Sequence, residues 1–261
     1  TLWLNRHGPV IIRRYHAAKQ PRDRMTDRLH IDQAFDQDLE RIREAILSMG
    51  GRVEEAITLA ARALEDRDED LAQAVIEGDR AIDALEEDID QQVVRLLALR
   101  QPQAGDLRSV ISVMKIAADL ERLGDYAKNM AKRVSVLATS PQIEGAGSSI
   151  RRQARQVGQM LSDMLVSFSH LDVALAEDVI TRDVEVDHMT NALFREFITH
   201  MMEDPRKISA CLHYTFIAKN VERMGDLVTG SAEHVIFLAT GSRPGDRVKG
   251  ASTASLDITP E

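Results

Sequence analysis

Apolar residues recur every three or four positions along three long stretches in the first half of the chain. These stretches run from Phe35 to Leu64, from Leu71 to Leu96 and from about Leu107 to Thr139, with polar residues between. This spacing places the apolar side chains on one face of a helix. A short break, "RQPQAGD", separates the second stretch from the third. Three long helices joined by short turns predict an antiparallel bundle.

A segment of small and polar residues, "TSPQIEGAGSS" at 139–149, ends this first set of helices. The same periodicity then restarts, and it predicts helices from Ile150 to Phe168, from about Val173 to Met202 and from about Arg206 to Leu238. Glycine, proline and serine clusters of this kind are typical of loops. We therefore expect residues 139–149 to form the boundary between two units.

The two units also share sequence. The segments "AADLERLGDYAKNMAKRVSVLATS" and "AKNVERMGDLVTGSAEHVIFLATG" lie 101 positions apart and are identical at 10 of 24 positions without a gap. Such a repeat indicates two copies of one structural unit. The predicted fold is all-α, with six long antiparallel helices in two tandem, pseudo-symmetric three-helix bundles. We expect the bundles at 32–140 and 148–240, between a disordered extension (1–31) and a disordered tail (241–261).

Charge and cysteine content narrow the class of protein. The formal net charge is −9, and residues 1–24 carry six basic residues against one acid, so the remainder is more acidic still. An acidic body disfavours binding to nucleic acid or to an anionic membrane. Cys211 is the single cysteine, which excludes an intrachain disulfide and fits a reducing compartment. Because no stretch approaches the roughly 18 apolar residues of a membrane-spanning helix, we predict a cytoplasmic protein.

Pairs of carboxylates lie on four of the predicted helices. The two members of each pair are four positions apart, so both side chains point to the same side of the helix. The pairs are Asp79 with Asp83, Glu121 with Asp125, Asp183 with Asp187, and Glu222 with Asp226. In each half the first pair precedes the second by a comparable length, 42 residues in one half and 39 in the other. The pairs therefore belong to the repeat.

These pairs indicate a bound cation. Like charges one turn apart destabilise a helix by roughly 0.2–0.5 kcal/mol, and by more when they are partly buried. Arg122 and Arg223 follow the two glutamates, but each projects about 100° away around the helix. Carboxylate oxygens are hard ligands that suit iron(III), manganese or magnesium and also accept zinc. We predict divalent or trivalent metal ions where the pairs of neighbouring helices converge.

Gly124 and Gly225 occupy the same place in the two copies of the repeat, inside predicted helices. Glycine in a helix interior destabilises the helix by roughly 1 kcal/mol relative to alanine. Two explanations of the repeated glycine are equally compatible with the sequence. One is a ligand that approaches the helix closely, and the other is close packing of two helices. The acid pairs, taken alone, are also compatible with a solvated surface.

Other candidate groups are weaker. Glu185 and His188 have the Glu-x-x-His spacing of di-iron bundles, but such sites use two copies of the motif on different helices. We expect His213 and His234 to be surface or packing residues, and Cys211 to be a buried structural thiol. The sequence contains no glycine-rich phosphate loop, Gly-x-Ser-x-Gly motif or zinc-finger spacing. No catalytic residue is predicted.

The repeated "LERLGD" and "VERMGD", the "DLR" at 106–108 and the "MMEDPR" at 201–206 together resemble the PhoU family over about residues 30–240. The resemblance implies two three-helix bundles that hold metal ions or small metal clusters at the eight paired carboxylates. It also makes Asn129, four positions after Asp125, a candidate additional oxygen ligand. The counterpart of Asn129 is Gly230, so Glu233 is the candidate in the second bundle. Arg122 and Arg223 are candidate accessory residues.

The resemblance also implies a function. Members of the PhoU family are non-enzymatic adaptors that link the phosphate ABC transporter to a sensor histidine kinase. They keep the phosphate-starvation response off when phosphate is plentiful and restrain phosphate uptake. The expected partners are therefore the kinase, the transporter's ATPase subunit and a second copy of the chain, with contact to the membrane only through partners. A ferritin-like di-iron carboxylate protein and a plain helical scaffold remain the alternatives.

Overall fold

The computed structural model describes residues 21–100 and 104–244, which form helices joined by short connections and contain no strand. The predicted all-α class is confirmed. The elements are α1 (Pro21–Asp66), α2 (Glu69–Arg100), α3 (Ala104–Ala131), α4 (Val134–Ala138), α5 (Ala146–His170), α6 (Val173–Glu203), the 3-10 turn η1 (Pro205–Lys207) and α7 (Ile208–Thr240).

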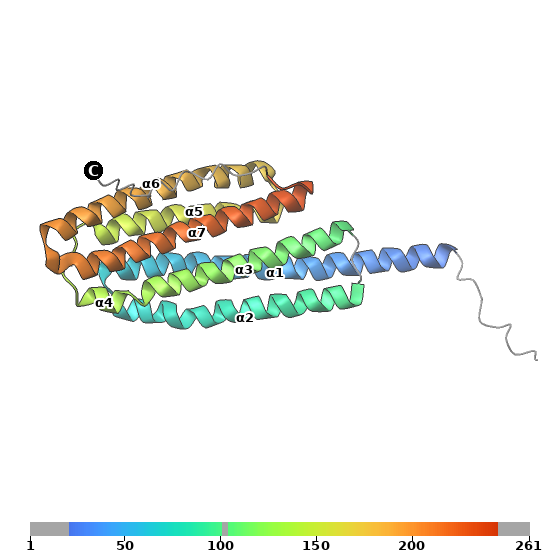
Figure 1. Ribbon diagram of the computed structural model, residues 1–261. Helices are drawn as coiled ribbons and strands as arrows, with labels where there is room; N and C mark the ends of the chain where they lie inside the picture. Colours follow the sequence, from blue (N-terminus) through green and yellow to red (C-terminus); the bar gives the residue numbers. More distant parts are fainter. Residues whose placement is uncertain (1–20, 101–103, 245–261) are drawn as a thin grey trace, which may run out of the picture.

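The long helices form two three-helix bundles, as the repeat predicts. Helices α1, α2 and α3 contact one another in the first bundle, and α5, α6 and α7 do so in the second. The bundles lie side by side, with α1 against α5 and α3 against α7, while α2 and α6 lie on opposite outer sides (Figure 1). Each long helix runs antiparallel to the next long helix along the chain (Figure 1).

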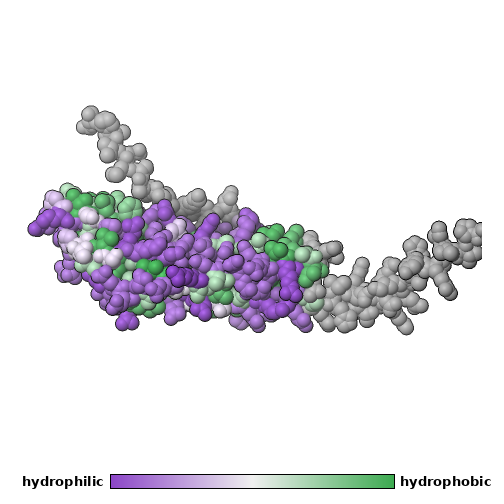
Figure 2. Space-filling model, turned by 90° about the horizontal axis from the view of Figure 1, so that it is seen from below, coloured by the Kyte–Doolittle hydropathy of each residue, from purple (hydrophilic) through white to green (hydrophobic). Residues whose placement is uncertain are grey.

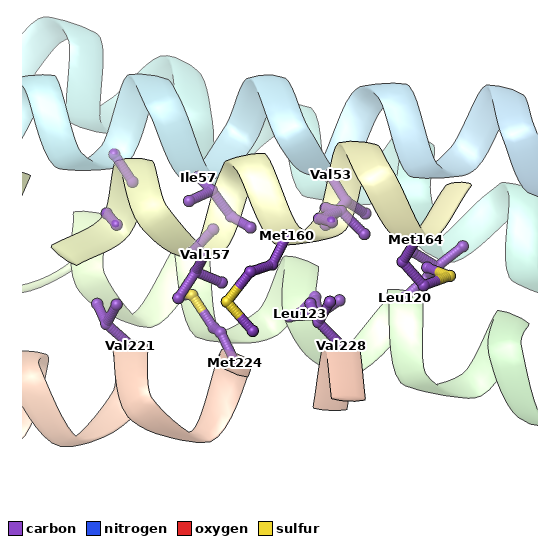
Figure 3. Packing of buried hydrophobic residues seen from close by; sticks show 14 of the residues in the cluster. Val53, Ile57, Leu120, Leu123, Val157, Met160, Met164, Val221, Met224 and Val228 are labelled. Carbon is purple, nitrogen blue, oxygen red and sulfur yellow. The ribbon is translucent and has the colours of Figure 1, made fainter. Parts of the chain in front are cut away.

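One hydrophobic core runs through both bundles. Figure 3 shows the region where α1, α3, α5 and α7 meet, and its labelled side chains point toward one another from all four helices. They are Val53, Ile57, Leu120, Leu123, Val157, Met160, Met164, Val221, Met224 and Val228, and all ten are buried. Removing this apolar surface from water favours folding by roughly 25 cal/mol per Å². The two repeats are therefore parts of one folded body.

The predicted end of the third helix is wrong. We expected one helix from Leu107 to Thr139, but α3 ends at Ala131 and the short helix α4 follows after a two-residue turn. At this turn the amide of Arg133 donates to the carbonyl of Met130 at 3.1 Å, three residues back instead of four. The break keeps Val134 and Leu137 buried, which explains why an apolar period alone did not reveal it.

The ends of the first helix and of the last also refine the prediction. Helix α1 begins at Pro21, inside the extension expected at 1–31, and proline is well suited to a first helical position. Helix α7 ends at Thr240 and is capped by Gly241, whose φ of 78° is a left-handed conformation that glycine adopts without strain. The remainder of the expected extension, 1–20, and of the expected tail, 245–261, lies outside the described residues. None of the described helices is long and apolar enough to span a bilayer.

The contact between α3 and α7 contains partly buried polar groups. The Ser231 hydroxyl on α7 donates to Asp119 Oδ2 on α3 at 3.0 Å, so a polar pair joins the two bundles. Nearby on α7, burial and more weakly the charges of Lys115 and Arg243 lower the pKa of His234 to about 4. His234 is thus a packing residue, as expected, and its ring is neutral at neutral pH.

This lowered pKa predicts a loss of stability in mild acid. The ordinary pKa of histidine is about 6.5, so the unfolded chain binds a proton that the folded chain rejects as the pH falls from about 6.5 toward 4. Between pH 7 and pH 5 the free energy of unfolding should fall by about 1 kcal/mol more in wild type than in His234→Gln, allowing for the partial exposure of the ring. Urea unfolding at both pH values measures this difference. Equal losses would contradict the assignment.

Candidate functional site

The carboxylate pairs lie where the outer helix of each bundle packs against its neighbour. Asp79 and Asp83 are on α2, opposite Glu121 and Asp125 on α3. In the second bundle Asp183 and Asp187 are on α6, opposite Glu222 and Asp226 on α7. The first aspartate of each outer helix is buried, because Asp79 is only 4% and Asp183 only 8% exposed.

The repeated glycines make room for these buried aspartates. A Cβ atom built on Gly225 would lie 2.7 Å from Asp183 Oδ1, closer than real contacts allow. A Cβ atom on Gly124 would lie 3.6 Å from Asp79 Oδ1 and 3.1 Å from the Cδ1 atom of Ile82. Close helix packing and the carboxylate site are therefore one feature, since each glycine admits the neighbouring helix together with its aspartate.

A lysine joins the carboxylates of the first bundle. The Lys128 ε-ammonium donates a hydrogen bond to Asp79 on α2 and another, at 3.3 Å, to Asp125 Oδ1 on α3. The Lys128 side chain is 25% exposed. An isolated carboxylate as buried as Asp79 is unfavourable without a counter-charge, and this ammonium provides one.

The remaining acids of the first bundle repel one another. Burial and then the neighbouring Asp125 raise the pKa of Glu121. Burial and then Asp79 raise the pKa of Asp83, although Lys128 opposes this effect. Raised carboxyl pKa values are the mark of negative charges gathered in partly desolvated surroundings. The first cluster, defined as Asp79, Asp83, Glu121 and Asp125, thus retains an excess of negative charge that favours a bound cation.

The second bundle neutralises its acids differently. Lys219 forms an ion pair with Glu222, and the Glu222 side chain is 15% exposed. The position that corresponds to Lys128 is occupied by Thr229, a fully buried residue. Its hydroxyl donates to the carbonyl of Gly225 at 2.8 Å and so remains on its own helix. The second cluster, defined as Asp183, Asp187, Glu222 and Asp226, repeats the carboxylates without repeating the lysine.

The accessory residues lie near the clusters with different exposure. Asn129 is exposed on α3, one turn beyond Asp125, and Glu233 is half-buried on α7. Arg122 and Arg223 are exposed. The charge of Arg122 acts on Asp119, where it opposes the rise in pKa that burial causes.

The carboxylate oxygens of the clusters are suitable metal ligands, but their present arrangement does not form a metal site. Carboxylate oxygens from two helices are the ligands that hard cations prefer. Across the described ranges, however, no three His, Cys, Asp or Glu side chains are arranged so that they would hold a metal ion as they stand. Metal binding would require carboxylates to rotate and, in the first cluster, Lys128 to move. The metal prediction stays a prediction.

The sequence reasoning missed three charged residues that act on these clusters. Lys128 lies three positions after Asp125, and Lys219 lies three positions before Glu222. Both spacings put a lysine on the same helical face as the acid, and this signal was present in the sequence. Glu86 adds to the rise in the pKa of Glu121 from the neighbouring helix, a contact that no spacing along one helix reveals.

The remaining candidates have structural surroundings. Cys211 is fully buried, and burial raises the pKa of its thiol, which disfavours the reactive thiolate. His213 Nδ1 lies 3.0 Å from Nη1 of Arg133, at the turn after α3. Glu185 accepts a hydrogen bond from Gln156 at 2.9 Å, and His188 is exposed.

Comparison with known proteins agrees with the repeated two-bundle fold. The family model described as the PhoU domain matches the chain twice, at residues 46–134 and 150–235. A curated relative from Zymomonas mobilis, named as a phosphate-specific transport system accessory protein PhoU homolog, is 42% identical over 85% of this chain and 93% of its own length. The crystal structure of PhoU from Pseudomonas aeruginosa has a TM-score of 0.77 and 40% identity, covering 80% of this chain and 100% of that one.

A second solved structure is similar as well. The phosphate transport system regulatory protein PhoU from Streptococcus pneumoniae has a TM-score of 0.74 and 32% identity, covering 80% of this chain and 99% of that one. Fold and site together define an all-helical protein of two pseudo-symmetric bundles, each with carboxylates repeated between its outer helix and the next. The sequence and structural matches extend over most of its length, and the chain belongs to the PhoU family.

Proposed function

We propose that this chain is a non-enzymatic, metal-binding adaptor of a phosphate-specific transport system. It couples the phosphate ABC transporter to a sensor histidine kinase and keeps the phosphate-starvation response and phosphate uptake low when phosphate is abundant. The observation that carries this proposal is membership of the PhoU family over both bundles, together with relatives named as accessory proteins of phosphate-specific transport. The adaptor acts in the cytoplasm as a homodimer and reaches the membrane only through its partners.

The surface supports a role in binding other proteins. Figure 2 shows a largely hydrophilic face with hydrophobic areas near its two ends. Exposed apolar side chains recur along one side of α7 at Ile208, Leu212 and Phe216, and Phe216 is 56% exposed. Met202 near the end of α6 is 81% exposed. Exposed apolar patches rimmed by polar residues are common at protein interaction sites, and we assign this end of the second bundle to the kinase or the transporter's ATPase subunit.

The proposal includes metal binding by the two clusters. A divalent or trivalent ion held by carboxylates of adjacent helices would neutralise their repulsion and fix how these helices face a partner. Iron, zinc, manganese and magnesium all suit the oxygen ligands. The clusters lie between the outer helix and its neighbour in each bundle, so a change there alters a long exposed helical surface.

A reporter of the phosphate-starvation regulon tests the proposal. In abundant phosphate, deletion of the gene should turn a phosphatase reporter on, and the wild-type gene should silence it. The double variant Glu121→Ala with Asp125→Ala should leave it at least partly on, because it removes half of the first cluster. Glu55→Ala with Glu177→Ala is the matched control, since it removes two exposed carboxylates outside the clusters, and it should silence the reporter like wild type.

The opposite outcomes are informative in different ways. A reporter that stays off without the gene would exclude negative regulation by this chain. Silencing by the Glu121 and Asp125 variant equal to that of wild type would separate regulation from the carboxylates. Protein levels and helicity of every variant are measured alongside, so that loss of the protein is not mistaken for loss of function.

A further inference from the structure

We infer that the ε-ammonium of Lys128 competes with metal ions for the first cluster, so that a metal bridges α2 and α3 there only when this ammonium leaves. The inference rests on the metal binding proposed above, but it concerns how the ion enters. It assigns Lys128 the role of a built-in counter-ion that determines metal affinity. Metal binding at the first cluster is then an exchange of one cation for another.

The position of Lys128 carries the inference. Its Nζ contacts one carboxylate from each helix, Asp79 on α2 and Asp125 on α3. A metal bridging the two helices would draw on these same two carboxylates. A metal ion and an ammonium group repel each other, and this repulsion is strong when both lie against the same partly buried pair of carboxylates. Displacing the Lys128 ammonium from these carboxylates costs free energy, and this cost weakens the binding of the metal.

The exchange has a route and a driving force. The Lys128 side chain is 25% exposed, and a flexible four-carbon stem lets its ammonium swing into water, where it is strongly hydrated. Asp79, which is 4% exposed, then needs another cation. A divalent or trivalent ion supplies more charge than the ammonium, and Asp83 and Glu121 add further negative charge to the same cluster.

The second copy of the repeat provides an internal comparison. Thr229 stands at the position of Lys128, one turn after Gly225, which again packs on a buried aspartate. The fold therefore accommodates threonine at this point of the helix. Lys128→Thr makes the first bundle like the second at this position and is the natural test variant.

The test measures manganese binding to the purified full chain. Glu222→Gln with Asp226→Asn forms the background, which weakens the second cluster, and free Mn²⁺ is followed by its electron paramagnetic resonance signal. Lys128→Thr in this background should bind Mn²⁺ at least tenfold more tightly than the background protein. Lys128→Arg keeps a cation and should show no gain. Lys132→Thr removes an exposed lysine four positions away and should also show no gain.

Three results would overturn the inference. They are equal affinity in Lys128→Thr and the background protein, an equal gain in Lys132→Thr, and no Mn²⁺ binding by Lys128→Thr. Adding Asp79→Asn to Lys128→Thr should abolish the gain, because it removes a shared ligand. A reporter result that excluded the adaptor function would leave these measurements unchanged, so the two proposals fail separately.

A measurement on the unmodified chain covers the case in which Lys128→Thr does not fold. Nuclear magnetic resonance of the lysine Cε and Nζ groups should show an ordered ammonium signal for Lys128 in metal-free protein, identified as the signal that Lys128→Arg removes. Zn²⁺ binding at the first cluster should convert this signal to that of a freely exchanging lysine. An unchanged Lys128 signal with Zn²⁺ bound by Asp79 and Asp125 would overturn the exchange.

Discussion

Lys128→Met should lower the free energy of unfolding by about 3 kcal/mol in metal-free buffer. The substitution keeps most of the length of the side chain but removes its charge. Asp79 is 4% exposed and its carboxylate is bound by the Lys128 ammonium, so the variant leaves a buried negative charge without this partner. Breaking a buried ion pair by removing one partner is strongly destabilising because the remaining charge is desolvated. Urea unfolding followed by circular dichroism, with a chelator present, measures the loss.

Lys132→Met is the control for this prediction. Lys132 is exposed in the turn after α3, and changing an exposed charge typically shifts stability by no more than about 0.5 kcal/mol. Adding Asp79→Asn to Lys128→Met should recover part of the loss, because the variant then buries a neutral amide. Equal stability of Lys128→Met and Lys132→Met would show that Asp79 does not depend on this lysine.

The arrangement of the helices was largely readable from the sequence. The apolar period located the long helices, and the repeat of 117–140 at 218–241 indicated two similar bundles. The break between α3 and α4 was not readable, because the matching stretch of α7 is continuous. The shared core was not readable. An apolar residue such as Leu120 or Met224 shows only that some neighbour covers it, and periodicity does not say whether that neighbour belongs to its own bundle or to the other.

The candidate site could be predicted only in part, because the sequence pattern of one helix does not show which groups of its neighbours it meets. The spacing of Glu121 and Asp125 places both on one helical face, and the repeat shows that this face matters twice. Which groups meet that face depends on how the next helix packs against it. The contact from Lys128 to Asp79 joins residues 49 positions apart, and the fit of Gly225 against Asp183 depends on the distance between two helices. The sequence pattern of a single helix shows neither that contact nor that distance.

Gly225→Ala should lower the free energy of unfolding by about 2 kcal/mol, although alanine is the better helix former. The added Cβ would lie 2.7 Å from Asp183 Oδ1 and 3.4 Å from Cγ1 of Val186. Asp183 is 8% exposed, so its carboxylate has little free space to move into, and α6 must move away from α7 instead. The gain in helix propensity, about 1 kcal/mol, offsets only part of this overpacking.

Variants at two other glycines distinguish the effect of the steric clash from the effect of alanine's higher helix propensity. A Cβ on Gly51 meets nothing within 4 Å, so Gly51→Ala should stabilise the protein by about 0.5–1 kcal/mol. Gly124→Ala meets a flexible side chain first, the Cδ1 atom of Ile82 at 3.1 Å, and Asp79 only at 3.6 Å, so its effect should lie between the other two. Urea unfolding of the three variants should rank Gly51→Ala above Gly124→Ala and Gly124→Ala above Gly225→Ala. If Gly225→Ala instead stabilises as much as Gly51→Ala, the glycine of the second repeat is not there to admit Asp183.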